Sequence, residues 1–290
     1  MPELPEVEVI VKSLKKSIEG LTISKIDINF PKVIKNQNPK GISEFKGKRI
    51  KDIYRNGKYI ITVFSDGCKI LTHLGMSGKL LVMPTESDIP KHSHLVYNFK
   101  ENHQRLIFND ARRFGKVIYS LNGESKVDKK LSTLGVDPLK VSLNKFLAML
   151  AERRCMIKSL LLDQTCIAGL GNIYIDESLF DAGIHPRSLS NEIPEQKALK
   201  LHKSMREILR LAIKTGGSSI SDYRKTDGSK GYFQIKHKIY GKVGKPCPVC
   251  GTIIERISAG GRNSAVCIKC QVPPVVKPSA KMICECWWGS

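Results

Sequence analysis

The alternation of hydrophobic and polar residues divides the chain into a short helix, a long β-rich region and a helical region. Between residues 6 and 19, apolar side chains recur at helical spacing, and Gly20 follows where such a helix would end: Val7, Ile10, Val11, Leu14 and Ile18. From residue 21 to about 120, short runs such as LTISKIDINF, KYIITVF, HLVYNFK and RLIFND are separated by Gly, Asn, Asp and Pro. These runs are typical of half-buried antiparallel strands, and they predict a β-sandwich or flattened barrel with one helix laid against it.

The pattern changes again near residue 134. Helical spacing returns in four stretches, 143–154, 156–164, 172–183 and about 195–214, and Thr215 to Gly217 end the last one. The polar, glycine-punctuated segment 218–234 is typical of a loop. The order of a strand-rich half and a helical half predicts an α+β protein with more than one domain.

Charge narrows the class of partner. The chain of 290 residues holds 48 Lys and Arg against 27 Asp and Glu, so its formal net charge is +21. This excess favours a nucleic acid as partner, with an anionic membrane surface second and a merely solubilising surface as the plain alternative. No apolar run approaches the roughly 20 residues of a membrane span. The acidic, proline-rich N-terminus resembles neither a signal nor a transit peptide, which predicts a cytoplasmic protein.

Four of the nine cysteines are spaced as metal ligands. Cys247 and Cys250 form one CxxC pair, Cys267 and Cys270 form another, and 16 residues separate the pairs. Two such pairs complete a tetrahedral site whose positions are all filled, so the pattern predicts one structural Zn²⁺ ion. The alternatives are four unrelated thiols, or the CxC pair formed by residues 284 and 286 as competing ligands. Three further cysteines lie in apolar contexts and are expected in the core: Cys68, Cys155 and Cys166.

The extreme N-terminus, MPELPEVE, is unusual because it combines a proline amine with neighbouring acids. Removal of Met1 would leave Pro2 with the free α-amine, which titrates near 8 where lysine titrates near 10.4, so on the order of a hundred times more of it is neutral at pH 7. A secondary amine attached to a sugar C1′ gives a charged iminium, and Glu3 is placed to transfer a proton. The plain alternative is a helix start, where proline and acids are favoured anyway.

Five stretches occur together and in one order: MPELPEVE, HLGMSG (73–78), NDARRFG (109–115), GLGNIYIDESLFDAGI (169–184) and the two cysteine pairs. Together they resemble the formamidopyrimidine-DNA glycosylase family of bacterial base-excision enzymes over residues 1–271. The resemblance implies a catalytic β-sandwich with an N-terminal helix at 1–133, a helix-two-turn-helix domain at 134–239 and a Cys₄ zinc-finger hairpin at 240–271, with DNA held in the cleft between them. Within the second domain, 217–231 matches the loop that covers the extruded base. The tail 272–290, with its two tryptophans, has no counterpart in the family.

The resemblance also implies roles for residues. Pro2 matches the Schiff-base nucleophile and Glu3 the acid that assists loss of the base and opening of the sugar. Lys58 matches a lysine that transfers protons and contacts phosphate. Arg262, between the cysteine pairs, matches the arginine that grips phosphate and serves the second step of a β,δ-elimination.

Further residues match the DNA-reading positions of the family. Met76, Arg112 and Phe114 match the three side chains that fill the gap left by an extruded base, although plain core packing is the alternative for Met76 and Phe114. Asn172, at the start of a helix, can hold a phosphate together with the helix N–H groups. The remaining candidate contacts to the DNA backbone are His92, Arg113, Arg153 and Lys158.

The expected partner is therefore double-stranded DNA that contains oxidised bases or abasic sites, bound by a monomer in the bacterial cytoplasm, with no membrane partner. Two alternatives stay open: an endonuclease VIII-like glycosylase for oxidised pyrimidines, and a DNA-binding protein that has lost its chemistry. HLGMSG and DARRFG favour the purine enzyme. Lys242 departs from the family, which commonly has arginine there, and a chain that kept Met1 would bind lesions without cutting.

Overall fold

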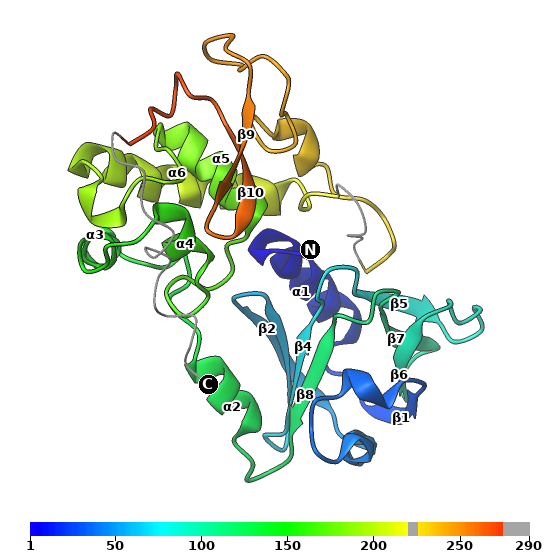
Figure 1. Cartoon of the computed structure of the whole chain (residues 1–290). Coiled ribbons are helices and arrows are strands. Elements are labelled where there is room, and N and C mark those ends of the chain that lie inside the picture. Colours follow the sequence, from blue (N-terminus) through cyan, green and yellow to red (C-terminus); the bar gives the residue numbers. More distant parts are fainter. Residues whose placement is uncertain (220–225, 275–290) are drawn as a thin grey trace. The chain divides into compact units, whose positions relative to one another are not determined.

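The computed structural model describes residues 1–219 and 226–274, and Figure 1 traces their secondary structure. Within this range the chain forms two compact units. The first contains residues 1–133 and, from much later in the sequence, the described parts of 212–234; the second contains 134–211 and 235–274. The units divide the chain differently from the predicted domains, because 212–234 clusters with the sandwich and the zinc hairpin shares a unit with the helices.

The first unit is an antiparallel β-sandwich with a helix at its N-terminus, as predicted. Helix α1 spans Leu4–Ile18. One sheet has the strand order β1-β6-β7-β5, formed by Ile23–Ile28, Ser93–Phe99, Gln104–Asn109 and Lys79–Pro84. The other has the order β2-β3-β4-β8, formed by Ile50–Asn56, Tyr59–Phe64, Lys69–His73 and Lys116–Ser120. Two short 3₁₀ turns, Pro31–Val33 and Pro39–Phe45, and helix α2 at Lys126–Ser132 complete it.

The core of this unit follows from the two periodicities. The apolar stripe of α1 is fully buried in one cluster with side chains from both sheets, among them Ile53, Phe64, Leu95 and Phe108. Burial of each such side chain stabilises the fold by about 1.5–3 kcal/mol. Because α1 is held along its whole length, the residues that precede it are fixed in place as well.

The second unit is built from helices and one β-hairpin. Helices α3, α4, α5 and α6 span Leu143–Ala151, Ile157–Leu162, Asn172–Ala182 and Glu195–Lys214, and the end of α6 passes into the first unit. Strands β9 (Glu255–Ala259) and β10 (Arg262–Val266) form the hairpin between the cysteine pairs. Two more 3₁₀ turns lie at Ser190–Glu192 and, where the chain leaves the first unit, at Phe233–Lys236. Helix α5 ends at Gly183, whose φ of 67° is the left-handed conformation that glycine adopts without strain.

The predicted α+β fold, with its sandwich, helical region and cysteine-bearing hairpin, is confirmed. The three cysteines outside the CxxC pairs are buried, also as predicted: Cys68, Cys155 and Cys166. Among the described residues, no helix is both long and apolar enough to cross a membrane.

Candidate functional site

The N-terminal segment is buried and is held by carboxylates of its own chain. Pro2 and Glu3 are both buried, and Glu3 is the N-cap residue of α1. Glu6 completes a capping box, since its Oε2 accepts the backbone N–H of Glu3 at 2.8 Å. The other oxygen, Oε1, accepts the backbone N–H of Ser218 at 2.8 Å. Glu6 thus joins the terminal segment to the start of the predicted lesion loop, of which residues 220–225 lie outside the described range.

Glu6 was not predicted as a site residue. The signal was present, because an acid three residues after an N-cap is the spacing of a capping box. Its second contact, to a residue more than two hundred positions later, could not be read from local sequence.

Lys58 and His73 are two hydrogen-bond donors near one end of the β2-β3-β4-β8 sheet. Lys58 is the last residue of the turn between β2 and β3 and is buried. His73, at the end of β4, pairs with Tyr59 across the strands, with 4.9 Å between the ring centroids. Burial, and then the positive charge of Lys58, lowers the pKa of His73 to about 4.

His73 is therefore neutral at pH 7, and its tautomer is fixed. The backbone N–H of Gly75 donates to its Nδ1 at 3.1 Å, so the ring proton lies on Nε2. An N–H donor beside a lysine is a suitable phosphate contact. His73 was not predicted as a site residue, because its place beside Lys58 follows from the pairing of His73 with Tyr59 across two strands.

Two neighbouring loops of the sandwich carry the predicted gap-filling residues. Met76 lies in the loop between β4 and β5, and Arg112 and Phe114 lie in the loop between β7 and β8. Met76 is 39 % exposed and Phe114 is 51 % exposed. The alternative of plain core packing is therefore wrong for both. The guanidinium of Arg112 stands over the ring of Phe114, 5.0 Å from its centroid.

His92 and Arg113 share an uncommon backbone conformation. Their φ values are 67° and 59°, and in the described residues they are the two non-glycine positions with positive φ. This region costs roughly 1–2 kcal/mol for a side chain with a Cβ. Both side chains are exposed, and the guanidinium of Arg113 stacks over the ring of Phe30 at 4.6 Å. Strain of this kind collects at functional loops, which agrees with the predicted role in DNA binding.

The predicted contacts of the second unit divide into exposed and buried residues. Arg262 is exposed and begins β10, directly after two positive-φ glycines that make the hairpin turn. Arg153 lies partly exposed beside Asp163, with 3.3 Å between nitrogen and oxygen. Asn172 is the first residue of α5, as predicted, but its amide nitrogen donates to the carbonyl of Asn263 at 2.9 Å.

Lys158 is a correction. The resemblance predicts a contact from Lys158 to the DNA backbone, yet the side chain has no exposed area. Its ammonium donates to Asp176 at 2.7 Å, to Ser264, and to the carbonyl of Asn263 at 3.4 Å. A lysine whose three N–H groups all donate to acceptors inside the protein cannot also bind a phosphate.

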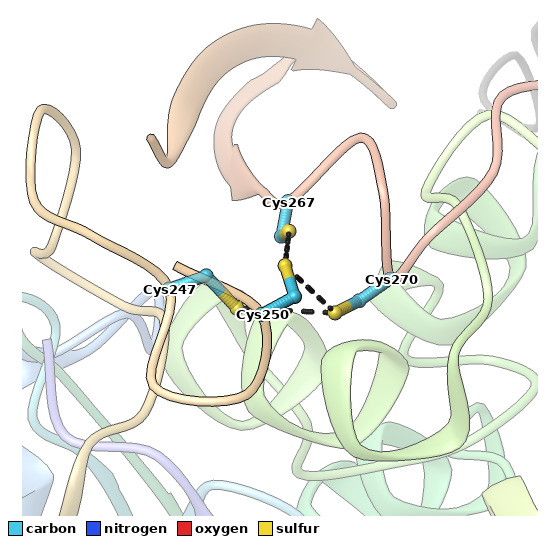
Figure 2. A group of neighbouring side chains, drawn as sticks. All are labelled: Cys247, Cys250, Cys267 and Cys270. Atoms are coloured by element: carbon cyan, nitrogen blue, oxygen red, sulfur yellow. Dashed lines mark hydrogen bonds between the residues drawn. The ribbon is translucent and has the colours of Figure 1, made fainter. Parts of the chain in front are cut away.

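The four predicted zinc ligands converge at one end of the β9–β10 hairpin (Figure 2). Their sulfur atoms all lie within 4.8 Å of one another, with separations of 3.4 Å for Cys250–Cys267, 3.5 Å for Cys250–Cys270 and 3.9 Å for Cys247–Cys270. A tetrahedral Zn²⁺ ion at its usual bond length sets sulfur atoms about 3.8 Å apart, so the cluster fits zinc and leaves no open position. The competing ligands at 284 and 286 lie outside the described residues.

Comparison with known proteins agrees with this geometry over most of the chain. Residues 1–117 match the formamidopyrimidine-DNA glycosylase N-terminal domain, and 134–224 match the formamidopyrimidine-DNA glycosylase H2TH domain. Residues 244–272 match the zinc finger found in FPG and IleRS, which together with the sulfur geometry identifies a structural zinc site.

Whole-chain similarity leads to the same class. The formamidopyrimidine-DNA glycosylase of Lactobacillus helveticus is 39 % identical over 94 % of this chain and 99 % of its own length. A crystal structure of a Lactococcus lactis FPG mutant with Fapy-dG-containing DNA is 36 % identical, with a TM-score of 0.87 over 94 % of this chain and all of that one. A structure of MutM with carbocyclic 8-oxo-G-containing DNA covers the same shares, with a TM-score of 0.86 and 36 % identity. The chain belongs to the formamidopyrimidine-DNA glycosylase family.

Proposed function

We propose that this chain is a DNA glycosylase of base excision repair that removes oxidised purines, namely 8-oxoguanine and formamidopyrimidines, from duplex DNA. We further propose that it acts as an AP lyase and cuts the strand by β,δ-elimination. The observation that carries the proposal is the buried Pro2–Glu3 segment, fixed by Glu6 at the head of α1. Its structural relatives were crystallised with DNA that contains Fapy-dG or carbocyclic 8-oxo-G, which favours purines over pyrimidines.

In the first step the neutral amine of Pro2, freed by removal of Met1, attacks C1′ of the damaged nucleotide. A C1′–N bond forms as the C1′–base bond breaks, and the base leaves with the bonding electrons and takes up the proton that the proline nitrogen loses. Glu3 donates a proton to the sugar ring oxygen as the ring opens, which gives the iminium. Its fixed position at the N-cap serves this transfer because the reacting groups need no further ordering.

In the second step the iminium acts as an electron sink. A base removes a C2′ proton, the C3′–O bond breaks, and the 3′ phosphate leaves; a second elimination releases the 5′ phosphate. Lys58 and neutral His73 supply hydrogen bonds to the phosphates on the sandwich side. Arg262, Arg153, Asn172, Arg113 and His92 serve as further phosphate contacts, and the +21 charge supports them.

The extruded base leaves a gap, which Met76, Arg112 and Phe114 fill by stacking and by a hydrogen bond to the partner base. We propose that the protein acts as a monomer on the DNA of a bacterial cell. The domain limits proposed for this activity are 1–133, 134–239 and 240–271.

Borohydride trapping tests the chemistry. With a duplex that contains 8-oxoguanine opposite cytosine, reduction of the iminium should give a stable protein–DNA adduct. Peptide mapping should locate the covalent link at Pro2. The matched control is the same chain with Met1 retained, which has no proline amine and should give no adduct. The variant Pro2→Gly should give a severely reduced yield of the adduct. Trapping that persists in the Met1-retaining chain would assign the nucleophile to an amine other than that of Pro2 and overturn the proposal.

A further inference from the structure

Asp110 lies at the junction of the two loops that carry the gap-filling residues. It follows β7 directly and has no exposed area. Its Oδ1 accepts the hydroxyl of Ser77 at 2.5 Å and the backbone N–H of Arg112 at 3.2 Å. Its Oδ2 accepts the backbone N–H of Gly115 at 2.7 Å. One carboxylate therefore closes the β7–β8 loop on itself and also bonds to the loop between β4 and β5.

Ser77 supplies the second half of this junction. It is the residue next to Met76, it is buried, and its oxygen accepts the backbone N–H of Arg112 at 3.2 Å while its proton goes to Asp110. Arg112 thus shares its N–H between a serine of one loop and an aspartate of the other. A hydrogen bond to a charged acceptor that is shielded from water is stronger than one between neutral groups.

The backbones of the two loops are also in direct contact. A Cβ added to Gly75 would lie 2.6 Å from the carbonyl carbon of Phe114 and 2.7 Å from the nitrogen of Gly115. A Cβ added to Gly115 would lie 2.5 Å from the ring of Phe108 and 3.1 Å from Oδ2 of Asp110. No side chain fits between the loops, so a displacement of one loop must displace the other.

We propose that Asp110 and Ser77 are positioning residues that lock the Met76 loop to the Arg112–Phe114 loop, so that the three gap-filling side chains insert as one unit. The inference rests on the proposed function. Three side chains that enter one gap lose less entropy on insertion if their loops are already ordered relative to each other. The two residues touch no base and no reacting atom in this role. They act through the loops.

A double-mutant cycle tests the lock. Single-turnover excision of 8-oxoguanine opposite cytosine is measured for Met76→Ala, Phe114→Ala and the double variant, first in the natural chain and then in Ser77→Ala. In the natural chain the two losses should be strongly non-additive, because either variant spoils the common unit. In Ser77→Ala the losses should become additive, and Ser77→Ala alone should slow excision about ten-fold, the loss expected for one hydrogen bond to a buried charge.

The control is Ser120→Ala. Ser120 is also a buried serine of the sandwich whose hydroxyl accepts a backbone N–H, that of Val127 at 2.8 Å, but it lies away from both loops. It should leave the cycle unchanged. Lyase activity on a single-stranded abasic oligonucleotide, which has no partner base to support, should be equal in the natural chain, Ser77→Ala and Ser120→Ala, and shows that the Pro2 chemistry is intact.

Gly75→Ala gives an independent variant, because it forces the backbones apart without deleting a side-chain donor or acceptor. It should reproduce the additivity seen in Ser77→Ala. If the coupling between Met76 and Phe114 stays the same in Ser77→Ala and Gly75→Ala, the lock is refuted. If the natural chain removes no 8-oxoguanine at all, it is the proposed function that fails.

Discussion

Lys158 Nζ lies 2.7 Å from Asp176 Oδ1, and the two side chains are 0 % and 1 % exposed. The pair joins α4 to α5, and it also reaches the zinc hairpin, because Lys158 donates to Ser264 and Asp176 Oδ2 accepts the N–H of Ala265 at 3.2 Å. Burial raises the pKa of Asp176 even beside this ammonium. Since β10 begins at Arg262, the pair helps to fix the strand that carries this arginine.

Lys158→Met should strongly destabilise the second unit. The change removes the partner of a buried carboxylate, and breaking such a pair costs about 3–5 kcal/mol. Replacing both residues, as Lys158→Met with Asp176→Leu, should recover most of the loss because no lone charge is left. The free energy of unfolding in urea is the measurement. Equal stability of Lys158→Met and the natural chain would show that the pair is not formed.

The salt dependence of DNA affinity separates Lys158 from a true phosphate contact. Arg113→Ala should reduce the slope of log affinity against log salt concentration by about one, since one phosphate contact is lost. The Lys158→Met, Asp176→Leu variant should keep the slope of the natural chain. A slope reduced by one in that variant would return Lys158 to the DNA interface.

Cys267→Ser should release the zinc ion and abolish specific DNA binding while the β-sandwich stays folded. The four sulfur atoms form one site within the second unit, so the first unit does not depend on it. Metal content by mass spectrometry and thermal unfolding of the variant are the measurements. Cys68→Ser, at a buried cysteine of the sandwich, is the control and should keep the metal. A metal content near zero in the natural chain would contradict the prediction.

His73 should make the fold less stable as the pH falls from about 6.5 to about 4. A histidine titrates near 6.5 in the unfolded chain, whereas burial beside Lys58 lowers the pKa of His73 to about 4 in the folded chain. Across this window the unfolded state binds up to one proton more than the folded state, so the free energy of unfolding decreases as the pH decreases. In His73→Gln the fall should be less steep. An NMR titration of the ring gives the pKa directly, and a value near 6.5 would refute the prediction.

Arg112→Ala should narrow the preference for cytosine opposite the lesion. The guanidinium can donate to O2 and N3 of cytosine, whereas adenine offers N1 beside a donating amino group. We expect a loss of about ten-fold on the 8-oxoguanine:cytosine duplex and a smaller loss with adenine. Phe114→Ala, which removes stacking alone, should slow both duplexes alike. Equal losses from Arg112→Ala on both would leave the arginine with a space-filling role.

Local patterns predicted the parts of this protein that depend on local chemistry. The apolar spacing in residues 6–19 predicts α1 because a helix buries one face, and the two CxxC pairs predict the zinc site because a knuckle fixes its own ligands. The strand-rich region was recognised from alternation, which reports that one face of each strand is buried.

Residues whose role depends on distant partners were missed or misread. Lys158 reads as one basic residue among 48, and its burial follows from Asp176 and Ser264, which the fold brings to it. Asp110 lies inside the motif NDARRFG but was not predicted as a site residue, because its bond to Ser77 joins two separate loops. Tertiary contacts of this kind leave no periodic signal in the sequence.

The bond between Glu6 and Ser218 has a consequence for how the protein is made. The ribosome completes the first 133 residues long before it reaches the segment 212–234 that the same unit contains. Until Ser218 has emerged from the ribosome, the nascent sandwich lacks the hydrogen bond from Ser218 to Glu6 that helps to hold its first residues. A polypeptide released before that point therefore carries an N-terminal segment that is less firmly held than in the folded chain.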